Sequence, residues 1–261
     1  YFFLKKKLIP RNKEFINFLN LNLKKWKIKK PLSKKRILVT GFVHLPTYYL
    51  QNAFISKFLE EYYKFNSIGL LEEHDHMGYH IYKSFDIKDI FFLKRACFFD
   101  RIKFFKQSID QLKNKENIED ILKLKINSIF IGKSTYDHYI RHTGNCSLEK
   151  KNFQIYYILS KALNINYQFK KILNDKKFNI KFLVQSELQF IPSSIIFQNC
   201  IFKNIKVYSR SRGPKWIGVT KFNNSKEIFS PRDKVDPNYF YSFYKKYRKK
   251  SAKLGFKIIR N

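Results

Sequence analysis

The chain has 261 residues, of which 44% are hydrophobic and 18% aromatic, and it carries a formal net charge of +33. This length allows one large domain or two small ones, and the apolar content excludes a chain that is disordered throughout. Three cysteines without paired spacing argue against a disulfide framework or a zinc ribbon, and they fit a reducing compartment. No apolar run reaches the ~18 residues of a membrane span, and nothing resembles a cleavable signal peptide.

The positive charge comes mainly from lysine, which is spread along the chain, and Ile, Asn, Phe and Tyr are over-used with it. Because all five residue types have A/T-rich codons, we attribute most of the charge to codon bias and a solvated surface. Attraction to an anionic membrane surface is the first alternative. We do not expect a nucleic-acid partner, since such a surface would use more arginine and concentrate it in a stripe.

Residues 1–35 are predicted to form a basic amphipathic segment. Phe15, Leu19, Leu23 and Trp26 recur at helical spacing among lysines and asparagines. A stripe this short is more often a packing face, so we favour a helix that packs on the following domain. The alternative is a helix lying on anionic lipid with its tryptophan at headgroup depth.

Residues 36–43 (RILVTGFV) are typical of a buried parallel strand. A helix starting near Pro46 and a second apolar strand over 67–73 follow, which predicts an α/β unit with a Rossmann-like layout. Ligands of such sheets collect beyond the carboxyl ends of the strands, so Gly41 and His44 are candidate site residues. The GxGxxG and Walker patterns are missing, and we predict neither a dinucleotide site nor a P-loop.

The middle of the chain is predicted to be largely helical. The histidine-rich stretch 74–80 (HDHMGYH) lacks the cysteines or second acidic cluster of a metal site, so we predict a polar loop and no metal. Residues 86–125 are predicted to be helical, with an aromatic stripe that we assign to packing rather than to base stacking. The pattern of residues 149–173 predicts another long helix.

The stretch 126–144 (INSIFIGKSTYDHYIRHTG) concentrates polar and aromatic groups after Gly132, and we predict that it forms one wall of a site. Asp137 and Arg141 lie four residues apart, which predicts an ion pair on one helix face. Direct catalysis by Asp137 and recognition of an acceptor carboxylate or phosphate by Arg141 are the alternatives. Tyr136 is either a core residue with a satisfied hydroxyl or a ligand contact.

The last third changes to strand–helix–strand. Residues 179–188 and 204–210 are predicted as parallel strands joined by a helix, with Glu187 and Arg210 at or just past their carboxyl ends. The polar ends of adjacent parallel strands face one crevice. Arg210 and Arg212 lie beside a glycine, where they either dock an anion or remain exposed loop residues.

Two segments, IFIGKSTYDHYIR and FLVQSELQFIPSSIIFQNCIFKNIKVYSR, resemble the amino-terminal half of bacterial capsule and surface-polysaccharide biosynthesis proteins. Those proteins are similar to glycosyltransferases built from two Rossmann domains. Gly132, Tyr136, Asp137 and Arg141 match the family pattern Ile-Gly-x-x-x-Tyr-Asp-x-x-x-Arg. The resemblance covers about residues 36–255.

The resemblance implies transfer of a sugar from a nucleotide-activated donor, which is a substrate rather than a cofactor, to a glycan or lipid-linked acceptor. Glu187, Asp137 and His44 are the candidates for the base that activates the acceptor, with His142 behind them. The alternative function is a non-enzymatic basic protein that binds nucleic acid or an anionic membrane. The expected location is the cytoplasm, with peripheral association at the inner face of the membrane as an open alternative.

The expected fold is an α/β three-layer Rossmann-like domain with a mainly parallel sheet, preceded by the basic amphipathic helix. We expect the amino-terminal segment to end at residue 35, the acceptor-side domain to span 36–255, and 256–261 to begin a connection to a second domain. Because the chain starts with Tyr1 rather than Met, we also expect it to continue beyond the given sequence.

Overall fold

The computed structural model describes residues 13–27, 33–144, 147–148, 151–211 and 218–228, and near the carboxyl end residues 245, 246 and 248. The chain divides into two units, residues 1–228 and 229–261. The architecture below belongs to the first unit. The predicted boundary at residue 255 falls outside the described residues.

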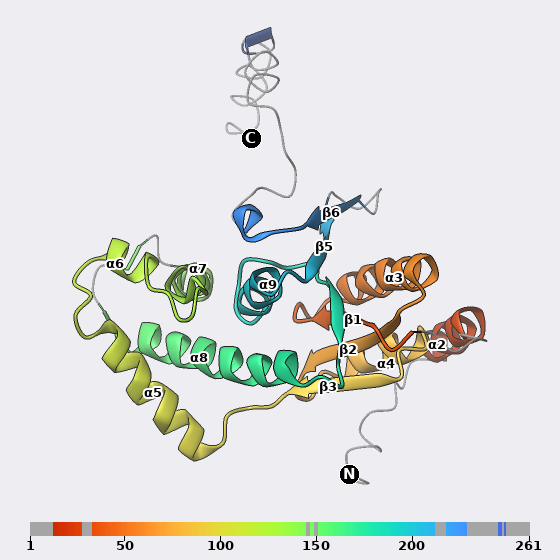
Figure 1. Ribbon diagram of the computed structural model, residues 1–261, viewed down its shortest axis with the longest axis horizontal. Helices are drawn as coiled ribbons and strands as arrows, with labels where there is room; N and C mark the ends of the chain where they lie inside the picture. Colours follow the sequence, from red (N-terminus) through yellow and green to blue (C-terminus); the bar gives the residue numbers. More distant parts are fainter. Residues whose placement is uncertain are drawn as a thin grey trace. The chain divides into compact units, whose positions relative to one another are not determined.

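Within the described part of the chain, the first unit is built on a six-stranded sheet with the order β3-β2-β1-β4-β5-β6 (Figure 1). Strands β1 to β5 are parallel to their neighbours, and β6 pairs antiparallel with β5. The strands are β1 Arg36–Gly41, β2 Asn66–Glu72, β3 Asp89–Leu93, β4 Ile180–Val184, β5 Lys206–Ser211 and β6 Gly218–Phe222. The predicted three-layer, mainly parallel α/β fold with an amino-terminal helix is confirmed.

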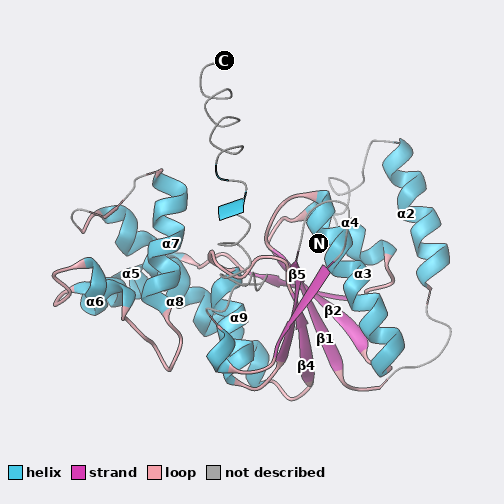
Figure 2. Cartoon of the chain, turned by 90° about the horizontal axis from the view of Figure 1, so that it is seen from above, coloured by secondary structure: helices cyan, strands magenta, loops and turns pink. Residues whose placement is uncertain are grey.

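Helices cover both faces of this sheet, as Figure 2 shows. Helices α3 and α4 pack on one face, and α8 and α9 pack on the other. The helical segments are α2 Lys13–Trp26, α3 Pro46–Tyr63, α4 His76–Ser84, α5 Phe98–Leu112, α6 Ile118–Leu122, α7 Ile131–Thr143, α8 Phe153–Asn174, α9 Ser193–Phe202 and the 3₁₀ turn η1 Ser225–Glu227. Among the described residues, none of these helices is long and apolar enough to cross a membrane.

Strand β1 is buried on both faces of the sheet, which explains its continuous apolar run. Leu38 belongs to the apolar cluster under α8 and α9, together with Phe169. Its neighbours Ile37 and Val39 belong to the cluster on the opposite face, together with Tyr49 of α3. Successive strand side chains alternate between faces, so two covered faces require apolar residues at every position.

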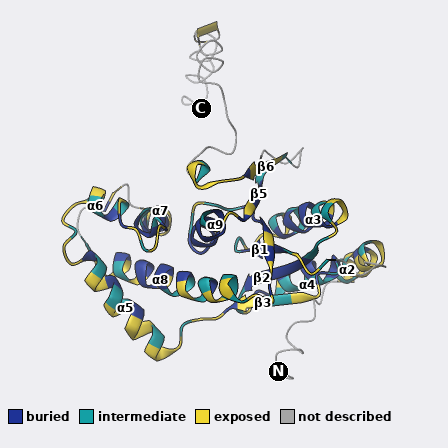
Figure 3. Ribbon diagram, in the orientation of Figure 1, coloured by how far each residue is buried: buried dark blue, intermediate teal, exposed yellow. Residues whose placement is uncertain are grey.

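A third apolar cluster lies between α8 and the helices α5, α6 and α7, and Figure 3 shows the buried sides of these helices. Helix α8 therefore serves two cores, one against the sheet and one against the helical group. Helix α9 is buried along almost its whole length because it contacts α7, α8 and β5 at once. Its apolar sequence follows from these neighbours.

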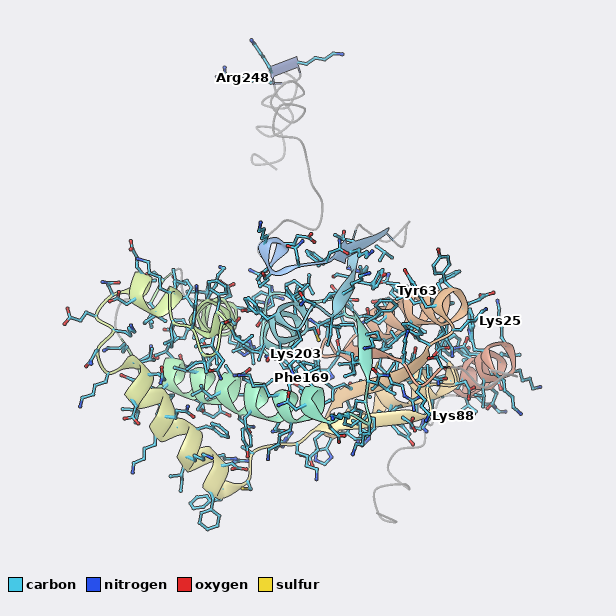
Figure 4. All side chains as sticks on the ribbon, viewed as in Figure 1. Lys25, Tyr63, Lys88, Phe169, Lys203 and Arg248 are labelled. Atoms are coloured by element: carbon cyan, nitrogen blue, oxygen red, sulfur yellow. The ribbon has the colours of Figure 1, made fainter. Side chains whose placement is uncertain are left out.

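Lysines lie mostly on the outside, and Figure 4 shows Lys25 and Lys88 at the periphery of the first unit. Lys57 is different. It is buried, and its Nζ donates to Glu60 Oε2 at 2.6 Å, while Glu60 Oε1 accepts the backbone N–H of Ser67 at 2.7 Å. This pair fixes the end of α3 to the start of β2, as a buried charge needs a partner and further hydrogen bonds.

Within the first unit, the amino-terminal helix α2 packs on α3 and α4 through one face. The Trp26 ring contacts Phe54 and Phe85, and Asn22 donates to the Ser84 hydroxyl of α4. Phe15 joins the same cluster. These contacts support the packing alternative for α2 over the lipid-lying one.

Two secondary-structure predictions are wrong. Stretch 74–80 is not a loop, because α4 begins at His76 and Asp75 caps it by accepting the Gly78 N–H. Residues 86–125 are not wholly helical, because β3 (Asp89–Leu93) pairs with β2 in parallel register. The run DIFFL fits a strand as well as a helix, and short apolar runs do not decide between them without the pairing. Strand β6 was not predicted at all.

Candidate functional site

The candidate site lies at the carboxyl edge of the parallel strands. Strand β1 is the centre of the topology: β2 and β3 follow it on one side, and β4 and β5 lie on the other. Ligands of open α/β sheets bind at such a point of reversal. The polar side chains that follow β1, β2, β4 and β5 therefore share one edge, and each is described in turn.

Buried amides and hydroxyls lock the ends of β1 and β4 together. Thr40 Oγ1 donates to Gln185 Oε1 at 3.0 Å, and Asn52 of α3 donates to the Thr40 carbonyl oxygen at 2.8 Å. The Ser186 hydroxyl donates to Asn52 Oδ1, and the Tyr82 hydroxyl donates to the same Thr40 carbonyl. Since each of these residues is buried, this network forms a rigid floor under the strand ends.

A second polar cluster joins the ends of β1 and β2. The Tyr49 hydroxyl donates to Asp75 Oδ2 at 2.6 Å, and His44 Nδ1 lies 3.1 Å from the Tyr49 oxygen. His44 Nε2 lies 3.2 Å from Glu72 Oε2. The Asp75 side chain is only 2% exposed, whereas those of His44 and Glu72 are 57% and 43% exposed. The cluster thus runs from a buried carboxylate to an accessible His–Glu pair.

The position of the Tyr49 ring depends on two glycines. A Cβ at either Gly41 or Gly78 would overlap the ring of Tyr49. Gly41 was predicted as a candidate site residue, either as a backbone approach to a sugar or as a simple turn, and in the structure it makes room for the Tyr49 ring. The ring it admits carries the hydroxyl that connects Asp75 to His44.

Proton positions in this cluster follow from the tyrosine. Burial, and then the hydrogen bond to Asp75, raise the pKa of Tyr49 far above its ordinary value, so the hydroxyl stays protonated. Its single proton is donated to Asp75, and the oxygen can only accept from His44 Nδ1–H. In the neutral ring, Nε2 therefore carries no proton and faces the Glu72 carboxylate oxygen as a second acceptor, and in the protonated ring it donates to that oxygen.

Glu187 follows β4 on the same edge but has a local role. Its Oε1 accepts the backbone N–H groups of Leu188 and Gln189 at 2.8 and 2.7 Å, and its carbonyl oxygen accepts from the Gln185 side chain. These bonds shape the loop between β4 and α9. A carboxylate oxygen used in this way is less available as a base than the His44–Glu72 pair.

Arg210 extends from the carboxyl end of β5 to the first turns of α3. Its guanidinium donates to Gln51 Oε1 at 2.7 Å and lies over the Tyr48 ring, 4.5 Å from the centroid. Helix α3 starts at Pro46 and has no side-chain cap. A guanidinium at the carboxyl end of a strand is a group that can bind an anion. Arg212 lies outside the described residues.

The predicted wall on α7 is assembled differently from the expectation. Asp137 forms its ion pair with Lys133, at 3.3 Å, rather than with Arg141. The Arg141 guanidinium instead lies over the Phe190 ring in the loop after β4, 5.4 Å from the centroid. Tyr136 packs at the edge of the helical core. Among the predicted site residues of α7, Arg141 contacts the loop after β4.

Gly132 has a packing role in α7. A Cβ there would overlap the backbone carbonyl oxygen of Ile121, and the Gly132 N–H donates to the Leu124 carbonyl at 3.0 Å. Glycine is therefore required for α6 to approach α7 closely. The role of Gly132 in substrate binding stays a prediction.

Within the residues that the structure describes, no group of three His, Cys, Asp or Glu side chains is placed to hold a metal ion. Cys97 and Cys200 are free thiols, and Cys146 is outside the described residues. A cavity of about 700 Å³ lies at the start of α6, lined in part by Glu116, Glu119 and Lys151. None of its lining residues belongs to the polar clusters at the strand ends.

Sequence reasoning identified His44, Glu187 and Arg210 but missed their partners. Glu72 ends β2 and Asp75 lies three residues after it, so both follow the strand-end rule, but the stretch around Asp75 was predicted only as a polar loop. Tyr49 gave no signal, because its hydroxyl meets Asp75 only through the packing of α3 on α4. No protein-family model, no curated protein and no solved structure matches this chain.

Proposed function

We propose that this chain is a glycosyltransferase-like protein of surface-polysaccharide assembly. It would transfer a sugar from a nucleotide-activated donor to a glycan or lipid-linked acceptor. The observation that carries the proposal is the Asp75–Tyr49–His44–Glu72 series at the same sheet edge as Arg210. The resemblance of the Tyr-Asp-x-x-x-Arg segment to capsule biosynthesis proteins supplies the substrate class.

The His44–Glu72 pair is the proposed general base. When the His44 ring is neutral, Tyr49 holds it as the Nδ1–H tautomer, and Nε2 and the Glu72 carboxylate are then two acceptors 3.2 Å apart that can take up one proton between them. A hydroxyl of the acceptor is the source of that proton. Both side chains are partly exposed, so an acceptor can reach them, and the buried Asp75 holds the far end of the series in place.

The transfer step balances with these groups. The acceptor O–H bond breaks and its proton goes to the Nε2···Oε2 pair, while a new bond forms from the acceptor oxygen to the anomeric carbon. The bond from that carbon to the donor phosphate breaks, and the nucleotide leaves with the electron pair. Arg210 offsets the charge on the departing phosphate.

The two roles are close in the chain as well as in the fold. His44 precedes Pro46, and Gln51 and Tyr48, which hold Arg210, lie in the first turns of the same helix. A movement of the α3 start would shift the base and the phosphate contact together. Holding two reactants in fixed geometry is a large part of transfer catalysis.

Nucleotide binding tests the phosphate side of the proposal. We expect at least one of UDP, GDP and ADP to bind in a calorimetric titration, and Arg210→Gln to weaken that binding about tenfold or more, as expected for a lost charge-assisted contact. Arg36→Gln is the matched control, because Arg36 lies at the opposite end of β1 and pairs with Asp89. Equal loss in both variants, or no binding of any diphosphate, would count against the proposal.

A further inference from the structure

The feature that the proposed chemistry leaves unused is an exposed aromatic face on α5. Phe98 and Phe99 are 70% and 80% exposed, and Ile102 is 50% exposed. The two phenylalanine rings contact each other edge to face, with centroids 5.9 Å apart. We assigned this stripe to packing rather than to base stacking, and at these three positions the side chains are exposed instead of packed.

Helix α5 has a second apolar face that its internal packing does not require. Its inner face, Phe104, Ser108 and Leu112, is buried against α8. A helix that packs on one side needs one apolar stripe. The outer face carries a second stripe, Phe98, Ile102 and Phe105, whose spacing of four and three residues is helical.

The exposed face extends onto α8. The Phe105 ring contacts the ring of Phe153, with centroids 5.4 Å apart, and Phe153 stacks on Tyr157. Phe153 is 69% exposed and Tyr157 is 51% exposed. The aromatic surface, defined as Phe98, Phe99, Ile102, Phe153 and Tyr157, therefore spans two helices. Exposed apolar side chains gathered on two packed helices in this way mark an interaction surface.

Positive charge surrounds the phenylalanine end of this surface. Residues 94–106 contain five basic side chains and one acidic one, and all five basic residues are exposed: Lys94, Arg95, Arg101, Lys103 and Lys106. Aromatic side chains with a rim of lysine and arginine match the boundary between lipid acyl chains and anionic headgroups. The net charge of +33 adds a long-range attraction to the same partner.

We propose that the aromatic surface docks this protein on an anionic lipid bilayer. Phe98, Phe99 and Ile102 insert at the level of the upper acyl chains, and the basic side chains of residues 94–106 bind headgroup phosphates. This inference deepens the proposed function by naming where a lipid-linked acceptor is met, and it rests on that function for this role only. Lipid binding itself requires neither donor nor transfer.

Vesicle sedimentation tests the docking surface without any sugar donor. The probes are phosphatidylcholine vesicles with and without 30% phosphatidylglycerol, and the variants are the double substitution Phe98→Ser and Phe99→Ser and the charge reversal Lys106→Glu. Leu21→Ser is the matched control, because Leu21 is 67% exposed on the other amphipathic helix, α2. All substituted side chains are exposed, and a thermal melt checks that each variant folds.

We expect binding to the anionic vesicles, a loss of about tenfold or more in the double variant, and a smaller loss in Lys106→Glu. The Leu21→Ser variant should bind like the unmodified protein. Binding lost in Leu21→Ser but kept in the double variant would assign docking to α2 and overturn the inference. Concentration-dependent dimers that the double variant abolishes, without vesicle binding, would overturn it too, since the surface would then join two copies. Neither outcome bears on the proposed nucleotide binding at Arg210. Failure of the lipid-docking inference can therefore be told apart from failure of the proposed function.

Discussion

Replacing Tyr49 by phenylalanine removes one oxygen atom from the centre of the candidate site. The Tyr49 side chain is fully buried, and its hydroxyl donates at 2.6 Å to the buried carboxylate of Asp75. After the change, Asp75 keeps the backbone N–H of Gly78 at 2.9 Å and has His44 Nδ1 at 3.8 Å, beyond hydrogen-bond distance. A buried charge therefore loses its shortest hydrogen bond.

The size of the effect follows from the charge of the acceptor. A hydrogen bond to a charged group contributes about 1.5–3 kcal/mol net, and one between neutral groups about 1 kcal/mol. We expect Tyr49→Phe to lower the free energy of unfolding by about 2–3 kcal/mol. Tyr82→Phe is the matched control, because the Tyr82 hydroxyl is equally buried but donates to a neutral backbone carbonyl, that of Thr40. We expect a loss of about 1 kcal/mol there.

Urea unfolding of the two variants at neutral pH measures the difference, provided that the slope of free energy against denaturant is unchanged. The order of the two losses is the decisive result. If Tyr49→Phe costs no more than Tyr82→Phe, then Asp75 does not depend on Tyr49, and the hydrogen-bonded series from Asp75 to Glu72 is not assembled as described.

Three further predictions concern stability. Glu60→Ala leaves the buried Lys57 ammonium without its carboxylate and should cost about 3–5 kcal/mol, whereas replacing both by apolar residues should cost much less in urea unfolding. Gly132→Ala forces a methyl group into the backbone of α6 and should cost at least about 1–3 kcal/mol, with a normal melting curve counting against the close helix contact. Burial and the neighbouring His142 lower the pKa of His138 to about 4. The stability tied to His138 is therefore complete above its ordinary pKa of 6.5 and falls between pH 6.5 and 4, by about 2 kcal/mol after allowance for solvent screening. His138→Gln should remove this part of the pH dependence. If the free energy of unfolding falls equally in both proteins between pH 6.5 and 4, the assignment to His138 is contradicted.

The fold was largely predictable because hydrophobic pattern and chain order determine it. The runs RILVTGFV, SIGLLEE and NIKFLVQSEL each became a buried parallel strand, and the intervening helices followed. Strand β3 was missed because DIFFL is a short apolar run that fits a strand as well as a helix, and a second apolar run follows after only two charged residues, Lys94 and Arg95. Only the pairing of β3 with β2 separates the two.

The candidate site was less predictable because its contacts depend on which of several equally spaced residues a side chain pairs with. Asp137 has a basic residue four positions away on each side, Lys133 and Arg141, and spacing cannot choose between them. Gly41 and Gly132 were predicted to lie at the site. What they accommodate, a tyrosine ring and a helix backbone, is set by elements distant in the sequence.

Exposure was the least predictable property. Phe98 and Phe104 are both phenylalanines of α5, yet one is 70% exposed and the other 4%. The sequence shows an apolar stripe on each side of the helix and does not say which side meets α8. The inference of a lipid-docking surface became available only after the packing of α5 on α8 had defined the outer face.

The most direct test of the central claim is turnover of a nucleotide sugar by His44 and Glu72 variants. We expect the unmodified protein to release nucleoside diphosphate from at least one of a panel of UDP-, GDP- and ADP-sugars. His44→Gln and Glu72→Gln should each lower the turnover rate about 10²-fold or more, as loss of a general base does, and leave the affinity for the diphosphate unchanged. Turnover that is undiminished in both variants, or a complete lack of donor consumption by the unmodified protein, would contradict the account.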